Sequence, residues 1–223
     1  MADKIFDLLK KEIVTGRLKP GEAFKEVAMA KQFNASRTPV REACNRLSSA
    51  GLLVPVPNKG YTVAPITIKD ILDVYDLRFL VEPLCAEYAA RNLSDEEIAE
   101  LEVLIQPERE HPEDAPHMTL IDINRLIHHR LAQATRNCRI VSLVDSLLLA
   151  AARMDFAFID VYPTEYTGHA EIMARLKERD AMGAREAMCR HIQLSQQRMS
   201  TIFSSERLAL SPASLERGSA FQK

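Results

Sequence analysis

Three histidines in the second half of the chain have the residue type and the spacing to bind a metal ion. His128, His169 and His191 fall in three separate expected helices, each in helical register with apolar residues. The imidazoles are therefore predicted to point into one helical bundle, where Asn124, one turn before His128, would add an amide oxygen. Such a set could bind one divalent ion. The alternative is that each histidine is a hydrogen-bonded core residue.

A segment near the N-terminus has the residue types for contact with nucleic acid. In ASRTPVREACNRLSSAG, residues 35–51, Thr38 suits the cap that precedes a helix and Gly51 suits its end. Arg37 and Arg41 then project from one edge of that helix, beside an apolar stripe for a small core. A helix end that is rich in donors and poor in carboxylates suits base edges and phosphates. From residue types alone, a solvated surface face explains the two arginines equally well.

The elements expected around this helix form a small DNA-binding domain. Helices at residues 3–15 and 25–33 precede it, and two β-prone runs, LLVPV and YTVAP, follow it. The basic turn PNKG joins the two runs. Two helices, a recognition helix and a β-hairpin make a winged helix-turn-helix, whose recognition helix enters the major groove. We predict this domain for residues 1–66.

The histidines require a different architecture, because no convincing strand follows Thr67. Apolar periodicity predicts a long helix over residues 68–91, and a Ser-x-x-Glu capping box at Ser94 opens the next helix. Four more helices are expected at residues 117–136, 139–159, 164–179 and 181–203. We therefore predict a mainly α protein in which residues 67–204 form an all-α bundle for effector binding and dimerisation. Residues 205–223 are expected to be a disordered tail.

Composition and charge restrict the class of protein. The chain has 223 residues, 47% of them hydrophobic, which is enough for two cores, and its four cysteines show no CxxC spacing. No secretory or membrane-spanning segment is expected, so we predict a cytoplasmic protein with no membrane role. Residues 1–66 hold 11 Lys and Arg against 6 Asp and Glu, whereas residues 67–223 hold 18 against 25. A basic N-terminal domain suits DNA, and chance clustering of charge is the alternative.

Positions 4 to 66 resemble the N-terminal domain of GntR-type bacterial transcriptional regulators. The resemblance lies in GRLKPGEAFKE, ASRTPVREA, GLL and NKGYTVAP, and the run SRTPVREA is among that family's most specific signals. It implies that the DNA-contacting residues are Ser36, Arg37, Thr38 and Arg41, with Lys59 and Gly60 at a wing tip near the minor groove. The chain departs from the family pattern at Val27, where an arginine is usual, so a phosphate contact is expected to be lost.

Residues 70–203 resemble the FCD effector domain of the FadR-like branch of that family. The resemblance lies in DLRFLVEPLCAEYAA, NRLIHHRLAQATRN and GHAEIMARLKERDAMGAREAMCRHI. In that domain three histidines and an aspartate often bind zinc or another transition metal beside the effector. The resemblance therefore implies a site for zinc, manganese or nickel at His128, His169 and His191. Asn124 stands where aspartate is common, and as a neutral, weaker oxygen ligand it is expected to lower the metal affinity.

Arg78 is a further candidate for the effector pocket. In similar domains an arginine at this place faces the cavity and can hold an effector carboxylate in a bidentate fork. The resemblance thus implies an organic-acid effector, bound by Arg78 together with Asn124 and the three histidines. The alternative for Arg78 is an ion pair with Glu82, one turn further along the same helix.

Together these features predict a metabolite-responsive transcriptional regulator, expected to be a repressor, that binds a pseudo-palindromic DNA operator as a homodimer. The rival is a metal-dependent enzyme, because three histidines could leave coordination positions open to activate water. The chain has no HExxH motif, Gly-rich phosphate loop or nucleophile elbow, so we predict that it is not an enzyme. A constitutive architectural DNA binder would leave the inward polar residues without a role.

Overall fold

The computed structural model describes residues 1–106, 117–158 and 168–209. The chain divides into two compact units. One comprises Met1–Thr67 together with Ala152–Ala157, and the other comprises Ile68–Ala151 and the described residues from Phe158 onward. The main division lies next to the predicted boundary between residues 66 and 67. The assignment of Ala152–Ala157 to the first unit was not predicted, because apolar periodicity cannot show which core a helix end joins.

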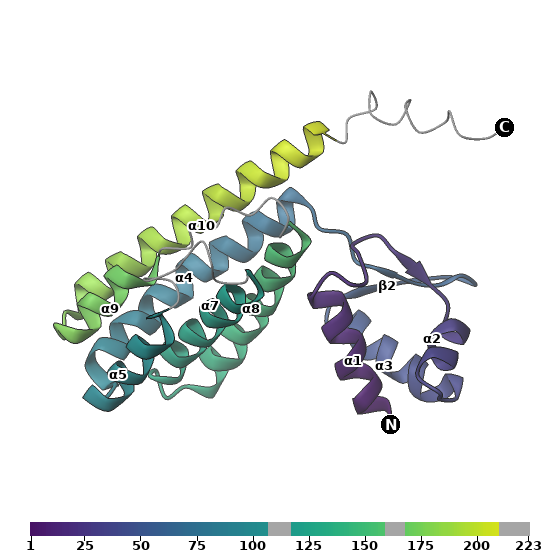
Figure 1. Cartoon of the computed structure of the whole chain (residues 1–223), viewed down its shortest axis with the longest axis horizontal. Helices are drawn as coiled ribbons and strands as arrows, with labels where there is room; N and C mark the ends of the chain where they lie inside the picture. Colours follow the sequence, from purple (N-terminus) through teal and green to yellow (C-terminus); the bar gives the residue numbers. More distant parts are fainter. Residues whose placement is uncertain (107–116, 159–167, 210–223) are drawn as a thin grey trace. The chain divides into compact units, whose positions relative to one another are not determined.

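The first unit combines three helices with a small antiparallel sheet. Its elements are α1 (Ala2–Val14), β1 (Ala23–Phe24), α2 (Glu26–Gln32), α3 (Arg37–Ser49), β2 (Leu53–Val56) and β3 (Gly60–Val63). The strand order is β1-β3-β2, and β2 with β3 makes the predicted hairpin (Figure 1). β1 was not predicted, because two residues are too few to show an alternating pattern.

The apolar stripe of α3 lies at the centre of this unit's core. It packs against the buried face of α1 and consists of Val40, Ala43, Cys44 and Leu47, all fully buried. Gly51 follows the helix with a φ of 72°, the left-handed conformation that glycine adopts at helix ends. These contacts fix which edge of α3 remains exposed.

The start of α3 differs from the prediction. The helix begins at Arg37, with Ser36 rather than Thr38 at the N-cap position, and the Ser36 side chain makes no capping hydrogen bond. Pro39 therefore lies within the first turn. That position tolerates proline because the first N–H groups of a helix have no helical acceptor. The recognition helix is thus longer at the end that carries Arg37.

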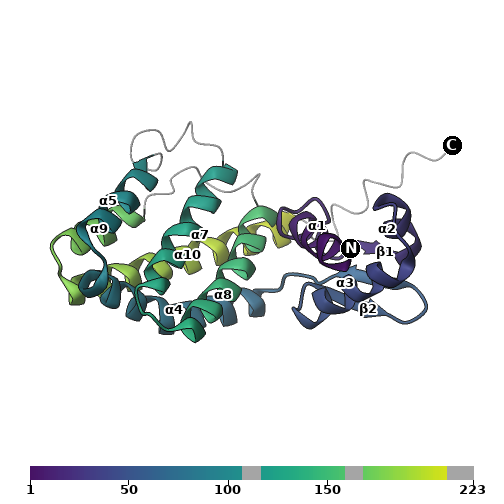
Figure 2. The ribbon, with the colours of Figure 1, turned by 90° about the horizontal axis from the view of Figure 1, so that it is seen from below.

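The second unit contains the predicted helical bundle. Its described helices are α4 (Ile68–Asn92), α5 (Asp95–Leu104), α7 (His117–Gln133), α8 (Cys138–Ala157), α9 (His169–Lys177) and α10 (Ala181–Ala209). α4 and α10 lie side by side, α7 packs on α4, and α9 packs on α10 (Figures 1 and 2). The capping box at Ser94 is present. The mainly α fold with an N-terminal winged helix-turn-helix is confirmed.

Two helix ends of this unit differ from the prediction. α10 continues to Ala209, past the expected boundary at residue 204, because ERLA after Ser205 consists of good helix formers. The remainder of the predicted tail, residues 210–223, lies outside the described residues. α7 ends at Gln133 instead of residue 136, and Arg136 has a φ of 55°, which a continuing helix cannot include. Residues 164–167 of another expected helix also lie outside the described part.

No helix in the described ranges is both long enough and apolar enough to cross a bilayer.

Candidate DNA interface and histidine centre

A groove in the first unit runs between the recognition helix and the wing. It has a volume of about 600 Å³ and is lined by residues of α2, α3 and the β2–β3 hairpin, among them Glu26, Arg37, Arg41, Lys59 and Gly60. Ser36 and Thr38 are exposed at the start of α3 but are not part of this lining. Four of the six predicted DNA-contacting residues therefore share one groove.

Glu26 of α2 holds both groove arginines. Arg41 donates hydrogen bonds from Nε to Oε1 and from Nη2 to Oε2 of Glu26, each 2.9 Å long. The Nη2 atom of Arg37 lies 3.5 Å from Oε2. The hydrogen bond from Arg41 lowers the pKa of Glu26. The arginines stay more than half exposed, at 62% for Arg37 and 56% for Arg41, so they can meet a ligand while Glu26 orients them.

The wing is tied to the recognition helix and to β1. The hydroxyl of Tyr61 in β3 donates a 2.9 Å hydrogen bond to Oδ1 of Asn45 in α3. Gly60 has a φ of 105°, and a Cβ atom there would lie 2.3 Å from the carbonyl oxygen of Phe24. Lys59 is exposed at the hairpin tip, where its N–H donates to the carbonyl oxygen of Val56. These contacts place Lys59 on the same side as the groove arginines.

Val27 lies on the wall of the same groove with 59% of its surface exposed. An apolar side chain at this place offers no hydrogen bond or charge to a phosphate. The structure thus locates the departure from the family pattern within the candidate interface.

We expect Glu26→Gln to reduce discrimination between operator and nonspecific DNA by roughly two- to fivefold, the scale of an exposed ion pair. The substitution removes a negative charge beside the DNA phosphates, which favours nonspecific binding, and it loosens the two arginines. Fluorescence anisotropy with a duplex selected from a random pool, and with a scrambled duplex, measures this ratio. Glu12→Gln is the control, because it breaks the Arg17–Glu12 pair outside the groove. An unchanged ratio would show that Glu26 does not position the arginines.

In the second unit, the three predicted histidines converge. His128 comes from α7, His169 begins α9 and His191 lies in α10, and their exposed fractions are 1%, 0% and 7%. Nε2 of His128 lies 3.2 Å from Nε2 of His169 and 3.2 Å from Nε2 of His191. One ligand nitrogen from each ring falls within 4.8 Å of the others. Nitrogen ligands about 2.0 to 2.1 Å from a tetrahedral ion are about 3.3 Å apart, so this spacing suits a transition metal.

Glu82 of α4 determines which nitrogen of His128 is available. Its Oε2 atom contacts Nδ1 of His128, and its Oε1 atom accepts a 2.6 Å hydrogen bond from Nε of Arg78. Burial raises the pKa of Glu82, but Arg78 and then His128 outweigh burial and hold that pKa at about 2. An ionised carboxylate accepts the Nδ1–H proton, which leaves the lone pair of Nε2 directed at the other two imidazoles. Carboxylate support of this kind is typical of metal-binding histidines.

The surroundings of His128 and His191 favour the neutral imidazole that a metal requires. Burial lowers the pKa of His128 by more than Glu82 raises it. Burial also lowers the pKa of His191 well below its ordinary value, and the adjacent rings of His169 and His128, which would repel it if they were protonated, act in the same direction. Neutral imidazoles with converging lone pairs can accept a divalent ion without first releasing protons.

Asn124, the fourth predicted ligand, has a buried amide oxygen. Its side chain lies one turn before His128 on α7, is 5% exposed, and its Oδ1 atom is buried without a hydrogen-bond partner among the described residues. A buried amide oxygen without a partner costs about 1 to 3 kcal/mol. A metal ion or a ligand donor would remove that cost. Asp122, by contrast, is exposed and lies 4.0 Å from Arg125.

Arg78 is buried in the bundle and forms the ion pair with Glu82 that was the alternative to an effector-binding role. It is 2% exposed, and its guanidinium carbon lies 5.0 Å from the centre of the Tyr75 ring. The pair with Glu82 uses the Nε atom of Arg78. It also connects Arg78 to His128 through one carboxylate.

The sequence alone missed two acidic residues of these sites. The sequence indicates Glu82 only as a partner of Arg78, and it indicates no partner for Glu26. Both are separated from their histidine or arginine partners by many residues, so no local spacing reveals the contact. One signal in the sequence could have revealed Glu82: an acidic residue on the apolar face of a helix is expected to be buried and therefore to have a partner. His129, next to His128 in the sequence, lies outside the cluster, is half-buried and pairs with Asp145.

Comparison with known families decides the identity. The family of bacterial regulatory proteins named gntR matches residues 1–63, and the FCD domain matches residues 73–194. The chain belongs to the GntR family and carries an FCD domain. This confirms the family predicted from the two resemblances.

Relatives of this GntR-family protein agree with that assignment. It is 27% identical over 196 residues to the uncharacterized HTH-type transcriptional regulator YdhC of Bacillus subtilis, covering 84% of this chain and 86% of that protein. It is 26% identical over 194 residues, 85% of each chain, to the HTH-type transcriptional repressor RspR of Escherichia coli. The structure of E. coli McbR/YncC matches with a TM-score of 0.77 at 22% identity, covering 92% of this chain and 98% of that one.

These comparisons also settle the class of protein. YdhC and RspR are named as regulators, as is the relative McbR of Escherichia coli, and the fold shared with McbR/YncC spans 92% of this chain. The prediction that the GntR-family chain is not an enzyme is confirmed, and the alternative of a metal-dependent enzyme has no support.

Proposed function

We propose that this GntR-family protein is a metabolite-responsive repressor that binds a pseudo-palindromic operator as a homodimer. Its FCD domain would bind a small carboxylate effector together with a divalent metal ion. The observation that carries the proposal is the convergence of three buried histidine Nε2 atoms on one point of the bundle. A purely structural core would not need three imidazoles with their lone pairs directed at each other.

The residues proposed to hold zinc, manganese or nickel are His128, His169, His191 and Asn124. When bound, the ion would supply positive charge and an open position for an effector oxygen. Glu82 orients His128 through Nδ1, and Arg78 lies on the other oxygen of Glu82. An effector carboxylate that bound Arg78 would therefore compete with Glu82, whose side chain also supports His128.

On the DNA side, we propose contacts from Ser36, Arg37, Thr38 and Arg41 to the major groove, and from Lys59 and Gly60 to the minor groove. The support is the shared groove and the exposure of both arginines. Repression rather than activation is favoured by the relative that is named a repressor. Because its ligand is DNA, we place the protein in the cytoplasm.

The direct test of the proposal measures operator binding in the presence of metals and organic acids. A duplex selected by the protein from a random pool serves as the operator, and anisotropy reports binding. We expect zinc plus at least one small carboxylate to change the affinity, with neither component sufficient alone. An affinity that no combination of metal and carboxylate changes would exclude a metabolite response of this kind.

Dimerisation is expected to use an exposed apolar stripe on α4. Leu77, Leu80 and Tyr88 are exposed at helical spacing, with the half-buried Leu84 between them, and Leu80 is 71% exposed. Exposed apolar stripes usually mark an interface, and a second copy of the chain would match an inverted-repeat operator.

We expect Leu80→Glu to convert the protein from a dimer into a monomer, because a charge would be buried at the centre of that stripe. Analytical ultracentrifugation measures the change. Val103→Glu is the matched control, since Val103 is 73% exposed on α5, outside the stripe. A wild-type protein that sediments as a monomer, both free and on DNA, would refute the dimer.

A further inference from the structure

Lys25 is a second exposed lysine of the groove between the recognition helix and the wing. It lines that groove together with Lys59. It is not among the residues that the family resemblance implies for DNA contact. In the chain it lies between Phe24, the last residue of β1, and Glu26, the first residue of α2. One residue therefore joins a strand of the wing sheet to a helix at the edge of the candidate interface.

The backbone of Lys25 is held from two sides. Phe24 pairs with Tyr61 of β3, and the Cα atom of Lys25 would lie only 3.1 Å from a Cβ atom placed on Gly60. On the helix side, the carbonyl oxygen of Lys25 accepts two N–H hydrogen bonds from the first turn of α2, 3.0 and 3.2 Å long. The base of the Lys25 side chain is therefore fixed against the wing.

Strand geometry directs the Lys25 side chain away from the core. Its backbone is extended, with a φ of −105° and a ψ of 143°, and successive side chains of an extended segment point to opposite faces. Phe24 points inward, where it is buried and its ring stacks on Tyr61 with centroids 6.1 Å apart. Lys25 consequently extends from the opposite, exposed face.

The groove holds more positive charge than its one carboxylate can balance. Lys25, Lys59, Arg37 and Arg41 line it, and Glu26 already pairs with both arginines. Within residues 1–106, 117–158 and 168–209, neither lysine ammonium has a hydrogen-bond or ion-pair partner. Two neighbouring positive charges without a counterion suit an external anion.

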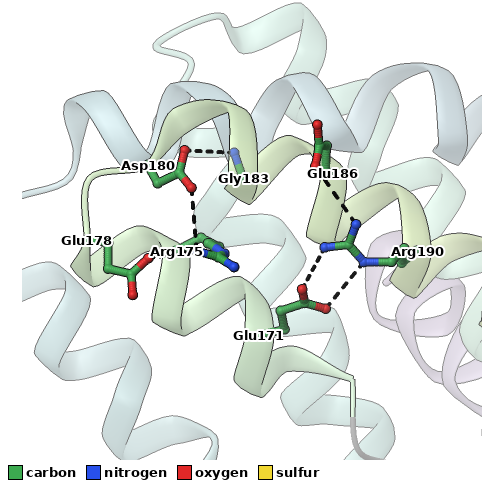
Figure 3. A network of polar contacts seen from close by, with 7 residues as sticks. All are labelled: Glu171, Arg175, Glu178, Asp180, Gly183, Glu186 and Arg190. Carbon is green, nitrogen blue, oxygen red and sulfur yellow. Dashed lines mark hydrogen bonds and ion pairs between the residues drawn. The ribbon is translucent and has the colours of Figure 1, made fainter.

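Exposed cations of the second unit show the contrast. Arg190 of α10 donates a 2.6 Å hydrogen bond from Nη2 to Glu171 (Figure 3). Arg175 of α9 lies 2.9 Å from Glu178 and 3.6 Å from Asp180. Each of these arginines has a carboxylate of its own, whereas the groove lysines have none among the described residues.

The candidate interface lacks the phosphate contact that an arginine in place of Val27 would make. Lys25 lines the same groove two residues earlier. We propose that Lys25 contacts a DNA phosphate and supplies the contact that Val27 cannot. The phosphate contact is thus moved along the chain instead of lost. This inference rests on the proposed DNA interface, and it concerns affinity for the DNA backbone, which carries no direct sequence information.

The salt dependence of operator binding tests the proposal. Anisotropy with the selected duplex between about 50 and 200 mM potassium chloride gives the slope of log Kobs against log[salt]. Lys25→Gln is expected to weaken binding roughly two- to fivefold and to flatten the slope by about 0.9 for each bound subunit. Lys31→Gln is the matched control, because Lys31 is exposed on the same helix but outside the groove lining. A wild-type slope in Lys25→Gln would overturn the proposal.

A loss of folding is a separate and measurable outcome. The Lys25 side chain makes no capping hydrogen bond to α2, so the thermal unfolding temperature of Lys25→Gln should equal that of the wild type. A flattened slope at unchanged stability supports a phosphate contact, and a lower unfolding temperature with an unchanged slope contradicts it.

Restoring the family's usual arginine shows whether the contact has moved. In the Lys25→Gln background, Val27→Arg is expected to recover most of the affinity and of the slope. In the presence of Lys25 the same substitution should add less, because both side chains would reach one phosphate. Additive effects would show that the two positions serve different phosphates, and the relocation would then be wrong.

Duplexes that each carry one neutral methylphosphonate linkage locate the phosphate. The wild type should lose affinity at one linkage or more where Lys25→Gln is insensitive. If Arg37→Ala weakens operator binding while Lys25→Gln matches the wild type at every linkage, the DNA interface stands and Lys25 is excluded from it. If neither variant changes binding, the proposed interface fails together with this inference.

Discussion

Replacing His128 with alanine is expected to abolish metal binding. Nε2 of His128 is the atom that both other imidazoles face, at 3.2 Å each, and Glu82 holds it in the ligand tautomer. Metal analysis of protein purified without a histidine tag, with added zinc, manganese or nickel, measures the loss. We expect close to one equivalent in the wild type and less than about a tenth in the variant. At a free metal concentration of 100 times Kd, about 2.7 kcal/mol of stability would also be lost.

His129→Ala is the matched control for this experiment. It removes the adjacent histidine of the same helix, which pairs with Asp145 instead of joining the cluster. Asn124→Asp should have the opposite effect to His128→Ala, because a carboxylate adds a formal charge and a stronger oxygen donor beside the same ion. If the wild type retains less than about a tenth of an equivalent of every metal offered, the three histidines are a polar pocket without an ion.

Arg37→Ala is expected to weaken operator binding by about 1–3 kcal/mol, or about 5- to 150-fold, if its guanidinium contacts a base in bidentate fashion. Arg37 touches Glu26 through one atom at 3.5 Å, so most of its donors remain available. Arg41 has Nε and Nη2 committed to Glu26, so Arg41→Ala should weaken binding less. Anisotropy with the selected duplex at fixed salt gives both values.

The wing should behave differently from the helix. Lys59→Ala is expected to lower affinity evenly across sequences and to flatten the dependence on log[salt] by about one phosphate contact. Arg17→Ala is the control, since Arg17 is 63% exposed in the same unit but outside the groove. Operator binding that is unaffected in the Arg37, Arg41 and Lys59 variants would contradict the proposed interface.

Most helices could be predicted because each pairs an apolar face with a recognisable end. The buried stripe of α3 and the left-handed Gly51 both follow from local sequence. The three histidines could be grouped for the same reason, since each shares a face with buried apolar residues. Local pattern alone already restricted these side chains to the interior.

Contacts between distant helices could not be predicted in this way. Whether Glu82 meets His128, 46 positions along the chain, depends on how α4 and α7 are rotated about their axes, and periodicity does not define that rotation. The pair of hydrogen bonds from Arg41 to Glu26 likewise depends on the angle at which α2 and α3 cross. The sequence indicated which residues are inward or exposed, and packing determined their partners.

Two adjacent residues of the wing, Lys59 and Gly60, differ in what limits their substitution. Lys59 is exposed at the tip, so a different side chain there would alter what the wing contacts at little cost to folding. Gly60, directly after it, has no room for any Cβ atom because the backbone of Phe24 is too close. Operator preference can therefore diversify through Lys59 while the hairpin keeps its place, whereas change at Gly60 would be eliminated for loss of structure before it could alter recognition.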